Sequence, residues 1–425
     1  MRFETDGIRG IYGTTLTEQT AFCLAAALGK KGSILLGRDT RPSSPSLARA
    51  AACGAAFVGA SVTAVGVVTT PALYYLLTQS NCDCAVMITA SHNPKEYNGL
   101  KVFTREGKLG QEERAEVESE MRKVPGAFDP DFPYHETPFT SPYVTFIKSV
   151  VGDLSGARVV VDLARGAGCA FSGLYRRLGA TVYEMNADGD GTYINENCGA
   201  LYPAACAKEV IKRGADLGVA IDGDGDRIIA VDSKGNILDG DLILYLLACR
   251  MKKKGLLNKN RIAMTVMTNG GVLKSLTEQG ITPVCTAVGD AAVAQAMKAE
   301  GLNLGGEQSG HVILGDYLPT GDALLVGAVL LKSILTDGAF DLTPPPKVYP
   351  QVLLNVPVYD KRVATLQSVQ DAAAQEREAL CEGRVLLRAS GTENLVRIMV
   401  EHPDAALAKK AANRLKEVVL RYSKV

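Results

Sequence analysis

Three aspartates alternate with glycine in one short stretch of the chain, Asp222-Gly-Asp-Gly-Asp-Arg227. In extended backbone, side chains two residues apart project to the same side, so the three carboxylates come close together and repel one another. A divalent cation would neutralise them, and hard oxygen ligands suit Mg²⁺. A calcium EF-hand loop needs glycine at its sixth position, where this chain has Arg227; an acidic turn without a metal is the other alternative. The pattern favours a magnesium site formed by Asp222, Asp224 and Asp226.

A serine stands where an apolar segment ends abruptly. Residues 86–90 are typical of a buried strand, and Ser91-His-Asn-Pro94 breaks it, because Pro94 fixes its own φ and keeps Asn93 out of the helical region. Ligands of α/β proteins bind at such strand ends. The alternative is a junction whose serine and asparagine make only local hydrogen bonds. Together with the other polar loops, this position favours a reactive hydroxyl at Ser91.

Two further loops could bind a phosphorylated sugar. The glycine-framed segment 305–311 offers a carboxylate, an amide, a hydroxyl and an imidazole, a set that fits vicinal sugar hydroxyls, although a plain glycine-rich turn is the alternative. Segment 388–392 supplies a guanidinium, two hydroxyls and successive backbone N–H groups, with Arg397 nearby, which is typical of a phosphate site. A surface turn with an exposed arginine is the alternative there. Neither a Walker P-loop nor a GxGxxG motif is present.

The composition is that of an ordinary globular protein without an overall electric field. Lys and Arg number 46, as do Asp and Glu, so neither nucleic acid nor membrane is expected as a partner, and phosphate recognition must be local. Ten scattered cysteines without zinc spacing are typical of free thiols in a reducing compartment. The first residues carry acids and no apolar core, and the longest apolar run, 323–331, is shorter than the ~20 residues that span a bilayer. These features predict a soluble, cytoplasmic protein.

The elements that must position these loops alternate between strands and helices. Near the start, predicted helices at 17–30 and 44–60 alternate with predicted strands at 33–36 and 61–68, ahead of the strand at 86–90, which predicts parallel βαβ units. The alternation restarts at about residue 141, where 171–178 is a predicted helix, and a proline-rich linker at 343–350 precedes a smaller unit. We expect an α/β fold with three similar domains built on mixed or parallel sheets and a smaller C-terminal α+β domain, at residues 1–140, 141–245, 246–342 and 351–425.

Four motifs occur in the order found in the α-D-phosphohexomutases: Ser91-His-Asn-Pro, Asp222-Gly-Asp-Gly-Asp-Arg, Gly306-Glu-Gln-Ser-Gly-His and Arg388-Ala-Ser-Gly-Thr-Glu. Each is moderately specific alone, but the four together, spread over almost the whole chain, are very specific. The chain therefore resembles this family, and most closely its bacterial phosphoglucosamine mutases, through segments 5–10, 194–199 and 217–241. The resemblance implies four domains around a central cleft, and interconversion of glucosamine 6-phosphate and glucosamine 1-phosphate.

The resemblance also implies roles for the candidate residues. Ser91 carries a phosphoryl group, and Mg²⁺ bridges that phosphate to Asp222, Asp224 and Asp226. A sugar 1,6-bisphosphate is the intermediate and activator, and Arg227 would stabilise charge on the transferring group. The implied substrate ligands are Glu307 and Ser309 for sugar hydroxyls, and Arg388, Ser390, Gly391, Thr392 and Arg397 for the phosphate that does not react.

A general acid and base must also serve the sugar hydroxyl. Lys101, close in sequence to Ser91, is our candidate. Its ordinary pKa of ~10.4 would have to fall, and Arg9 placed nearby would lower it by like-charge repulsion. His92 and His311 are the alternatives, because imidazole titrates near neutrality.

Some positions depart from the pattern of the phosphoglucosamine mutases. Glu4, Ala291 and Asn394 replace residue types that are usual there, and Glu96-Tyr-Asn-Gly99 looks more like the phosphomannomutase/phosphoglucomutase branch. A mutase of that branch is therefore the alternative, with the same mechanism. A phosphosugar phosphatase and a non-catalytic sugar-phosphate sensor are further alternatives, and the intact Ser91 and aspartates argue against the sensor. The oligomeric state is left open.

Overall fold

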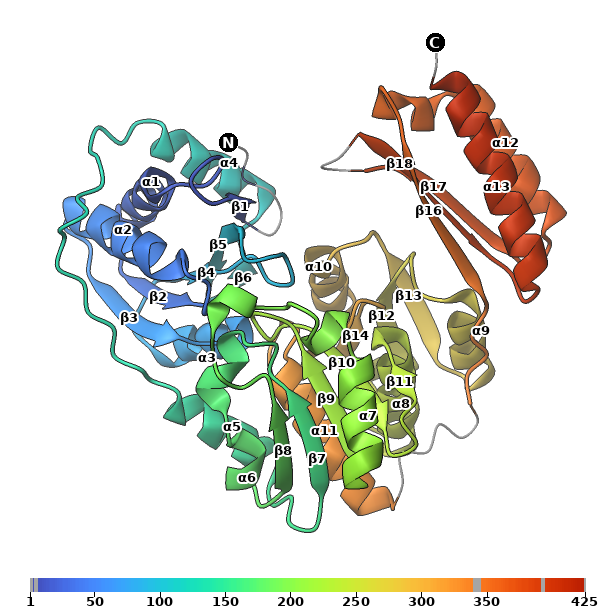
Figure 1. Cartoon of the computed structure of the whole chain (residues 1–425), viewed down its shortest axis with the longest axis horizontal. Coiled ribbons are helices and arrows are strands. Elements are labelled where there is room, and N and C mark those ends of the chain that lie inside the picture. Colours follow the sequence, from blue (N-terminus) through green and yellow to red (C-terminus); the bar gives the residue numbers. More distant parts are fainter. Residues whose placement is uncertain (1–2, 4–6, 339–344, 391–393, 424–425) are drawn as a thin grey trace. The chain divides into compact units, whose positions relative to one another are not determined.

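The computed structural model describes residues 3, 7–338, 345–390 and 394–423 of the chain (Figure 1). Two predicted phosphate ligands, Gly391 and Thr392, lie outside these residues. The chain divides into two compact units, Met1–Val266 with Val284–Asp341, and Met267–Pro283 with Leu342–Val425. Within the described ranges, no helix is both long and apolar enough to cross a membrane.

The first sheet of unit 1 carries the serine loop. Its strands are β1 (Ile8–Ile11), β2 (Ile34–Arg38), β3 (Val62–Val67), β4 (Cys84–Ile88), β5 (Tyr97–Thr104) and β6 (Gly107–Lys108). They lie in the order β1-β5-β4-β2-β3, with β6 beside β5. β2 is parallel to β3 and β4, as expected for βαβ units, whereas β5 is antiparallel to both β4 and β1. Every residue of β4 is buried, so the strand is a fixed base for the loop that follows.

Four helices accompany this sheet: α1 (Glu18–Gly29), α2 (Ser44–Phe57), α3 (Thr70–Gln79) and α4 (Gln111–Met121). α1 and α2 pack closely through small residues. A Cβ added to Gly54 on α2 would lie 2.0 Å from the backbone oxygen of Phe22 on α1, so only glycine allows this approach. Apolar side chains from both helices and the sheet form one core.

The second sheet carries the acidic loop. Its strands are β7 (Arg158–Asp162), β8 (Thr181–Met185), β9 (Leu217–Ile221), β10 (Ile228–Asp232) and β11 (Ile237–Leu238), and its helices are α5 (Ser141–Val151), α6 (Leu174–Arg177) and α7 (Ala204–Arg213). The strand order is β11-β10-β9-β7-β8. β9 and β10 are antiparallel partners, and Asp222–Arg227 forms the turn that joins them.

The third sheet carries the predicted sugar loop. Its strands are β12 (Arg261–Thr265), β13 (Thr282–Thr286), β14 (Leu304–Gly306) and β15 (Val312–Leu314), in the order β13-β12-β14-β15. The helices of this part of the chain are α8 (Gly240–Lys253), α9 (Gly270–Glu278), α10 (Asp290–Glu300) and α11 (Ala323–Asp337). The segment 307–311 is the turn of the antiparallel pair β14–β15.

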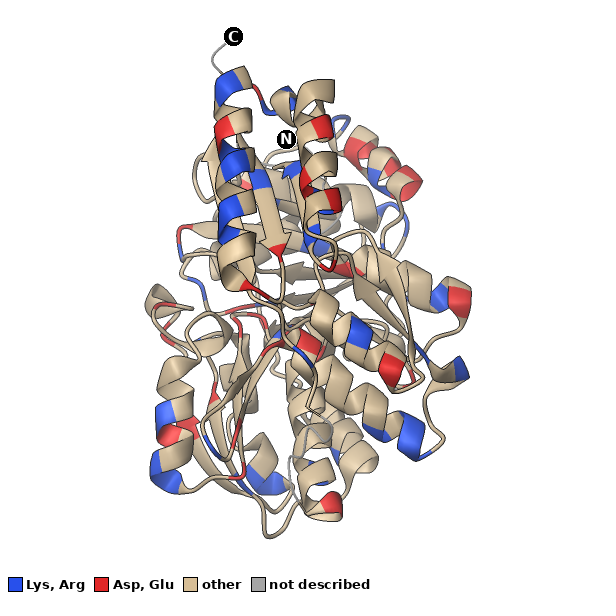
Figure 2. Cartoon of the chain, turned by 90° about the vertical axis from the view of Figure 1, so that its right-hand side faces the viewer, with Lys and Arg blue, Asp and Glu red and all other residues tan. Residues whose placement is uncertain are grey.

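Unit 2 combines α9 with a small antiparallel sheet. Its strands are β16 (Gln351–Pro357), β17 (Arg384–Ala389) and β18 (Leu395–Glu401), in the order β16-β18-β17, and its helices are α12 (Gln367–Ala379) and α13 (Ala405–Tyr422). The two helices and the sheet share an apolar core. The exposed basic residues of α13 are Lys409, Lys410, Arg414, Lys416 and Arg421. Figure 2 colours the lysines and arginines of the chain blue.

The structure corrects the sequence reading in several elements. The helix predicted at 171–178 is shorter than expected: α6 spans only Leu174–Arg177, because Gly173, with a left-handed φ of +75°, separates it from a 3₁₀ turn at Ala167–Phe171. Helices α3 and α5 and strands β5 and β8 were not predicted. The strand β5 matters most, because it places Lys101 on the sheet directly beside β4.

Candidate active site

The Ser91 hydroxyl lies at the first aspartate of the acidic loop. Ser91 follows shortly after β4, is 2% exposed, and donates a 2.6 Å hydrogen bond from Oγ to Oδ2 of Asp222. Its φ is +52°, a left-handed backbone that costs a non-glycine residue about 1–2 kcal/mol. The structure therefore brings the predicted reactive serine and acidic loop together within unit 1.

The three aspartates form a buried cluster. Asp222, Asp224 and Asp226 are at most 5% exposed, and one carboxylate oxygen of each lies within 4.8 Å of the others. Burial, followed by the charges of Asp226 and Asp224, raises the pKa of Asp222 well above its ordinary value. Oδ1 of Asp224 is buried and finds no hydrogen-bond partner among the described residues. An all-oxygen set of this kind, with an unused lone-pair direction, fits a hard divalent cation such as Mg²⁺.

Lys101 partly offsets the charge of this cluster. Its Nζ lies 2.7 Å from Oδ2 of Asp224 and 2.9 Å from Oδ2 of Asp226, and the residue is 2% exposed. Lys101 reaches the acidic loop because β5 is antiparallel to β4, with Lys101 opposite Met87. The predicted general acid and base thus lies in contact with two of the predicted metal ligands.

The backbone of the acidic loop requires its glycines. A Cβ on Gly223 would lie 2.6 Å from the carbonyl oxygen of Ser91, and Gly225 has a φ of +71° with Thr69 packed against it. The side chain of Thr70, at the start of α3, donates to Oδ2 of Asp224 at 2.5 Å, and its backbone N–H donates to the Asp224 carbonyl at 2.9 Å. Thr70, at the start of a helix beside the first sheet, therefore fixes the carboxylate of a predicted metal ligand beside the second sheet.

Arg227, Arg9 and His92 lie at the serine and acidic loops. Burial disfavours the charged form of Arg227, but Asp226 and Asp222 outweigh that effect and raise its pKa; Nε of Arg227 lies 3.9 Å from Oδ1 of Asp226. Nη1 of Arg9 lies 3.4 Å from Oδ1 of Asn93 in the serine loop. Nδ1 of His92 lies 3.4 Å from Oγ of Ser91, and burial, then Arg227 and Arg9, lowers the pKa of His92 to about 4. His92 is therefore neutral at physiological pH and a weak base.

The predicted sugar loop is bound through its backbone to β10, the strand that follows the acidic loop. The carbonyl of Gly310 accepts a 2.9 Å hydrogen bond from the N–H of Ile228, the first residue of β10. Glu307 is half-buried and accepts from the N–H of Gly289 at 2.9 Å, while Ser309 is exposed. His311 is 3% exposed, with Nε2 at 3.4 Å from Oδ2 of Asp290. The loop that carries Glu307 and Ser309 is thus attached to the strand that follows the aspartates.

The predicted phosphate ligands belong to unit 2. Arg388 on β17 and Arg397 on β18 are direct cross-strand partners, and both are exposed. Partial burial and the neighbouring Arg397 charge lower the pKa of Arg388. Two guanidinium groups held side by side favour an anion between or above them. Ser390 follows at the end of β17 and is 2% exposed.

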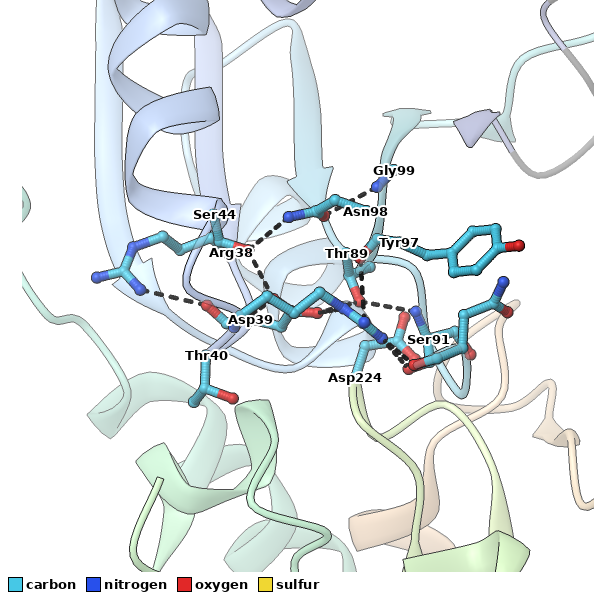
Figure 3. A network of polar contacts seen from close by, with 12 residues as sticks. Arg38, Asp39, Thr40, Ser44, Thr89, Ser91, Tyr97, Asn98, Gly99 and Asp224 are labelled. Carbon is cyan, nitrogen blue, oxygen red and sulfur yellow. Dashed lines mark hydrogen bonds and ion pairs between the residues drawn. The ribbon is translucent and has the colours of Figure 1, made fainter. Parts of the chain in front are cut away.

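One arginine that we had not singled out organises the serine loop. Arg41 is fully buried, and Asp39 fixes its guanidinium through a 2.9 Å contact to Nε. Asp39 also accepts from Thr89 and Ser44, as Figure 3 shows. The guanidinium donates to four carbonyls of the serine loop, those of Ser91, Asn93, Pro94 and Tyr97. The only sequence signal was a polar turn at 38–42, after the strand next to β4.

Comparison with known protein families matches nearly the whole chain. The phosphoglucomutase/phosphomannomutase models for alpha/beta/alpha domains I, II and III match residues 1–126, 141–235 and 239–342, and the model for the C-terminal domain of the same family matches residues 353–418. The curated relatives include a phosphoglucosamine mutase of Limosilactobacillus reuteri, 41% identical over 98% of this chain and 97% of its own length. Another is the phosphoglucosamine mutase of Bacillus subtilis, 40% identical over 98% of each chain.

Solved structures share the fold at lower identity. A phosphoglucomutase/phosphomannomutase family protein of Burkholderia thailandensis superimposes with a TM-score of 0.83 at 23% identity, covering 99% of this chain and 97% of its own. An N-acetylphosphoglucosamine mutase of Aspergillus fumigatus, in complex with GlcNAc-6P and magnesium, gives a TM-score of 0.70 at 17% identity over 100% and 96%. The same enzyme in complex with glucose 1,6-bisphosphate gives 0.69 at 17% identity, over 100% and 96%.

Proposed function

The chain belongs to the phosphoglucomutase/phosphomannomutase family, and on that premise we propose that it interconverts glucosamine 6-phosphate and glucosamine 1-phosphate. The observation that carries the proposal is the 2.6 Å contact between Oγ of Ser91 and Asp222 inside a buried aspartate cluster. The choice of glucosamine rests on the relatives, which are about 40% identical over 98% of the chain and are phosphoglucosamine mutases.

In the proposed reaction, a phosphoryl group passes from Oγ of phosphorylated Ser91 to the free hydroxyl of a hexosamine monophosphate. The P–O bond to Ser91 breaks, a P–O bond to the sugar forms, and the hydroxyl proton moves to a base, which yields a sugar 1,6-bisphosphate. The sugar then turns end for end, and its other phosphoryl group returns to Ser91. Such transfers depend on positioning and charge neutralisation, because the protein itself contributes little covalent chemistry beyond the serine.

The residues of the chain have distinct tasks in this scheme. Asp222, Asp224 and Asp226, together with the oxygen of Ser91, would hold one Mg²⁺. When bound, that ion supplies positive charge to the transferring phosphoryl group. Lys101 is proposed to hold and return the hydroxyl proton, and Arg227 to stabilise charge, with Arg9 beside the serine loop.

Recognition of the rest of the substrate is also a proposal. Glu307 and Ser309 would bind sugar hydroxyls. The non-reacting phosphate would bind Arg388, Ser390, Gly391, Thr392 and Arg397, and a clamp that accepts either phosphate permits the sugar to turn. A sugar 1,6-bisphosphate would act as activator by loading Ser91. The bounds of the four domains and the cytoplasmic location, both predicted from the sequence, remain proposals.

A panel of substrates tests the function. Purified protein with Mg²⁺ and the matching 1,6-bisphosphates is assayed with the phosphates of glucosamine, N-acetylglucosamine, glucose and mannose. We expect the highest kcat/KM with glucosamine phosphate, and no turnover by a Ser91→Ala variant that melts at the wild-type temperature. If glucosamine phosphate is the poorest substrate, the branch suggested by Glu96-Tyr-Asn-Gly99 is correct and our choice of sugar is wrong. Release of inorganic phosphate without isomerisation would contradict the mutase reaction itself.

A further inference from the structure

Asn195 connects the second sheet to the backbone of the serine loop. The residue is 5% exposed and lies in the segment between β8 and β9, in the order of the chain. Its Nδ2 donates to the carbonyl oxygen of Ser91 at 2.9 Å and to that of Asn93 at 3.3 Å. Nη2 of Arg41 donates to the same two carbonyls, at 2.8 Å each. Each carbonyl is therefore bound by two fixed donors, one from each sheet.

The position of Asn195 is constrained from the other side by the acidic loop. A Cβ added to Gly223 would meet the Ser91 carbonyl at 2.6 Å and Nδ2 of Asn195 at 2.8 Å, so the amide fills the space between the two loops. The backbone of Asn195 is left-handed, with φ of +60°, and its N–H donates to the Ala164 carbonyl at 3.0 Å. The amide is thus held in place by its own backbone and packed against both reacting loops.

These contacts bear on the direction of the Ser91 hydroxyl. Ser91 has a left-handed φ of +52°, which costs energy for a non-glycine residue and persists where the surrounding structure imposes it, and the direction of Oγ follows that of the backbone. Two donors on that carbonyl hold the backbone, and therefore hold Oγ at the aspartates. Phosphoryl transfer is sensitive to such placement, since a displacement of about 1 Å can lower a rate about 10²-fold.

We propose that Asn195 is a positioning residue for phosphoryl transfer, which holds the serine loop so that Oγ of Ser91 faces the metal-binding aspartates. The inference rests on the proposed function. It adds a residue that acts only through the backbone of the serine loop. Thr70 acts in the opposite direction, from the first sheet onto Asp224, so each loop is oriented by a side chain of the other sheet.

Two substitutions distinguish the effect of the Asn195 side-chain amide from the effect of its left-handed backbone. Asn195→Gly removes the side chain and tolerates the left-handed φ, and Asn195→Asp keeps the size and tolerates that φ while replacing the donor with a carboxylate that repels both carbonyls. Asn197 is the matched control, since its φ is +54° in the same segment and its side chain is exposed. The control variants are Asn197→Gly and Asn197→Asp.

The test combines kinetics with hydrogen exchange in the sugar-free and metal-free protein. We expect both Asn195 variants to lose about 10- to 100-fold in kcat, with KM for the sugar phosphate changed by less than about twofold. Amides of the serine loop, residues 91–98, should exchange faster in both, whereas the Asn197 variants match wild type in each measurement. Wild-type kcat or unchanged exchange in Asn195→Asp overturns the inference. Failure of the wild-type protein to isomerise any sugar phosphate overturns the proposed function instead, and the exchange measurement still decides whether Asn195 holds the loop.

Discussion

Oγ of Ser91 and Oδ2 of Asp222 lie 2.6 Å apart although 131 residues separate them in the chain. The contact joins the end of β4 on one sheet to the end of β9 on another. It places a hydroxyl against a carboxylate that carries an unfavourable charge, because burial and two neighbouring aspartates raise the pKa of Asp222. The proposed nucleophile and the proposed metal ligands therefore form one structural group, so we expect a substitution in one to change the properties of the other.

Replacing Asp222 with asparagine should stabilise the metal-free protein and abolish its response to Mg²⁺. The substitution removes one of three crowded carboxylates, whereas in wild type a cation at 100 times its Kd adds about 2.7 kcal/mol of stability. Thermal melting in EDTA and in Mg²⁺ measures both effects. Asp131→Asn, at an exposed position, serves as control. A wild-type Mg²⁺ shift in Asp222→Asn would contradict the assignment of the metal site.

Thr70 should set the affinity for Mg²⁺ through its hydrogen bond to Asp224. Thr70→Val keeps the shape and removes the 2.5 Å bond, so we expect the Mg²⁺ concentration for half-maximal binding to rise about tenfold or more. Thr70→Ser keeps the hydroxyl and should retain the wild-type value. Titration calorimetry with Mg²⁺ alone gives the comparison. Equal affinities in the two variants would show that Thr70 does not orient the ligand.

Lys101→Met should lower kcat about 10²- to 10⁴-fold if Lys101 transfers the proton. Methionine preserves most of the side-chain volume, and Lys148→Met on the surface of α5 is the matched control. Turnover near the wild-type rate would remove Lys101 from the role. His92→Gln and His311→Gln would then be compared, and the low pKa of His92 allows it to act only as a weak base.

Asp322 should make the stability of unit 1 depend on pH. The residue caps α11 and accepts from Tyr143, and burial raises its pKa from 3.8 to about 6. Because its pKa is raised in the folded state, Asp322 favours folding most below pH ~4 and loses this contribution as the pH rises to about 6, by about 3 kcal/mol in total. Asp322→Asn lacks this loss, so its melting temperature relative to wild type should be higher at pH 7 than at pH 4.5. A constant difference between the two proteins would contradict the raised pKa.

The sequence was informative where chemistry is concentrated in short motifs. Ser91, the aspartates and the loop at 305–311 could be identified because polar residues interrupt apolar strands, and most strands and helices of unit 1 followed from their periodicity. Asn195, Thr70 and Arg41 could not be identified in this way. Asn195 lies 104 residues from Ser91, and Thr70 lies 154 residues from Asp224, so only the folded structure, in which loops of the two sheets meet, shows what their side chains contact.

Prediction from local sequence pattern also failed where the backbone conformation of a single residue limits a helix. Residues 171–178 have helical composition, but Gly173 adopts a left-handed φ and breaks the segment. The sequence did not predict a strand at 97–104, yet this segment is the largely buried strand β5, which carries Lys101. In both cases the backbone path, rather than the residue types, decides where the functional group lies.

The path of the chain through unit 2 has a practical consequence for engineering. The segment Met267–Pro283, with α9, belongs to the same unit as the C-terminal sheet, and its Gly270 N–H donates at 2.7 Å to Glu401, which is fully buried. A truncation at the proline-rich stretch 343–350 would leave the segment Met267–Pro283 in the protein without the C-terminal strands of its own unit. A shortened protein intended for expression or crystallisation should therefore also replace α9, Gly270–Glu278, but keep β13 from Thr282 onward, because β13 belongs to the third sheet. Otherwise a helix without its packing partners would expose apolar surface.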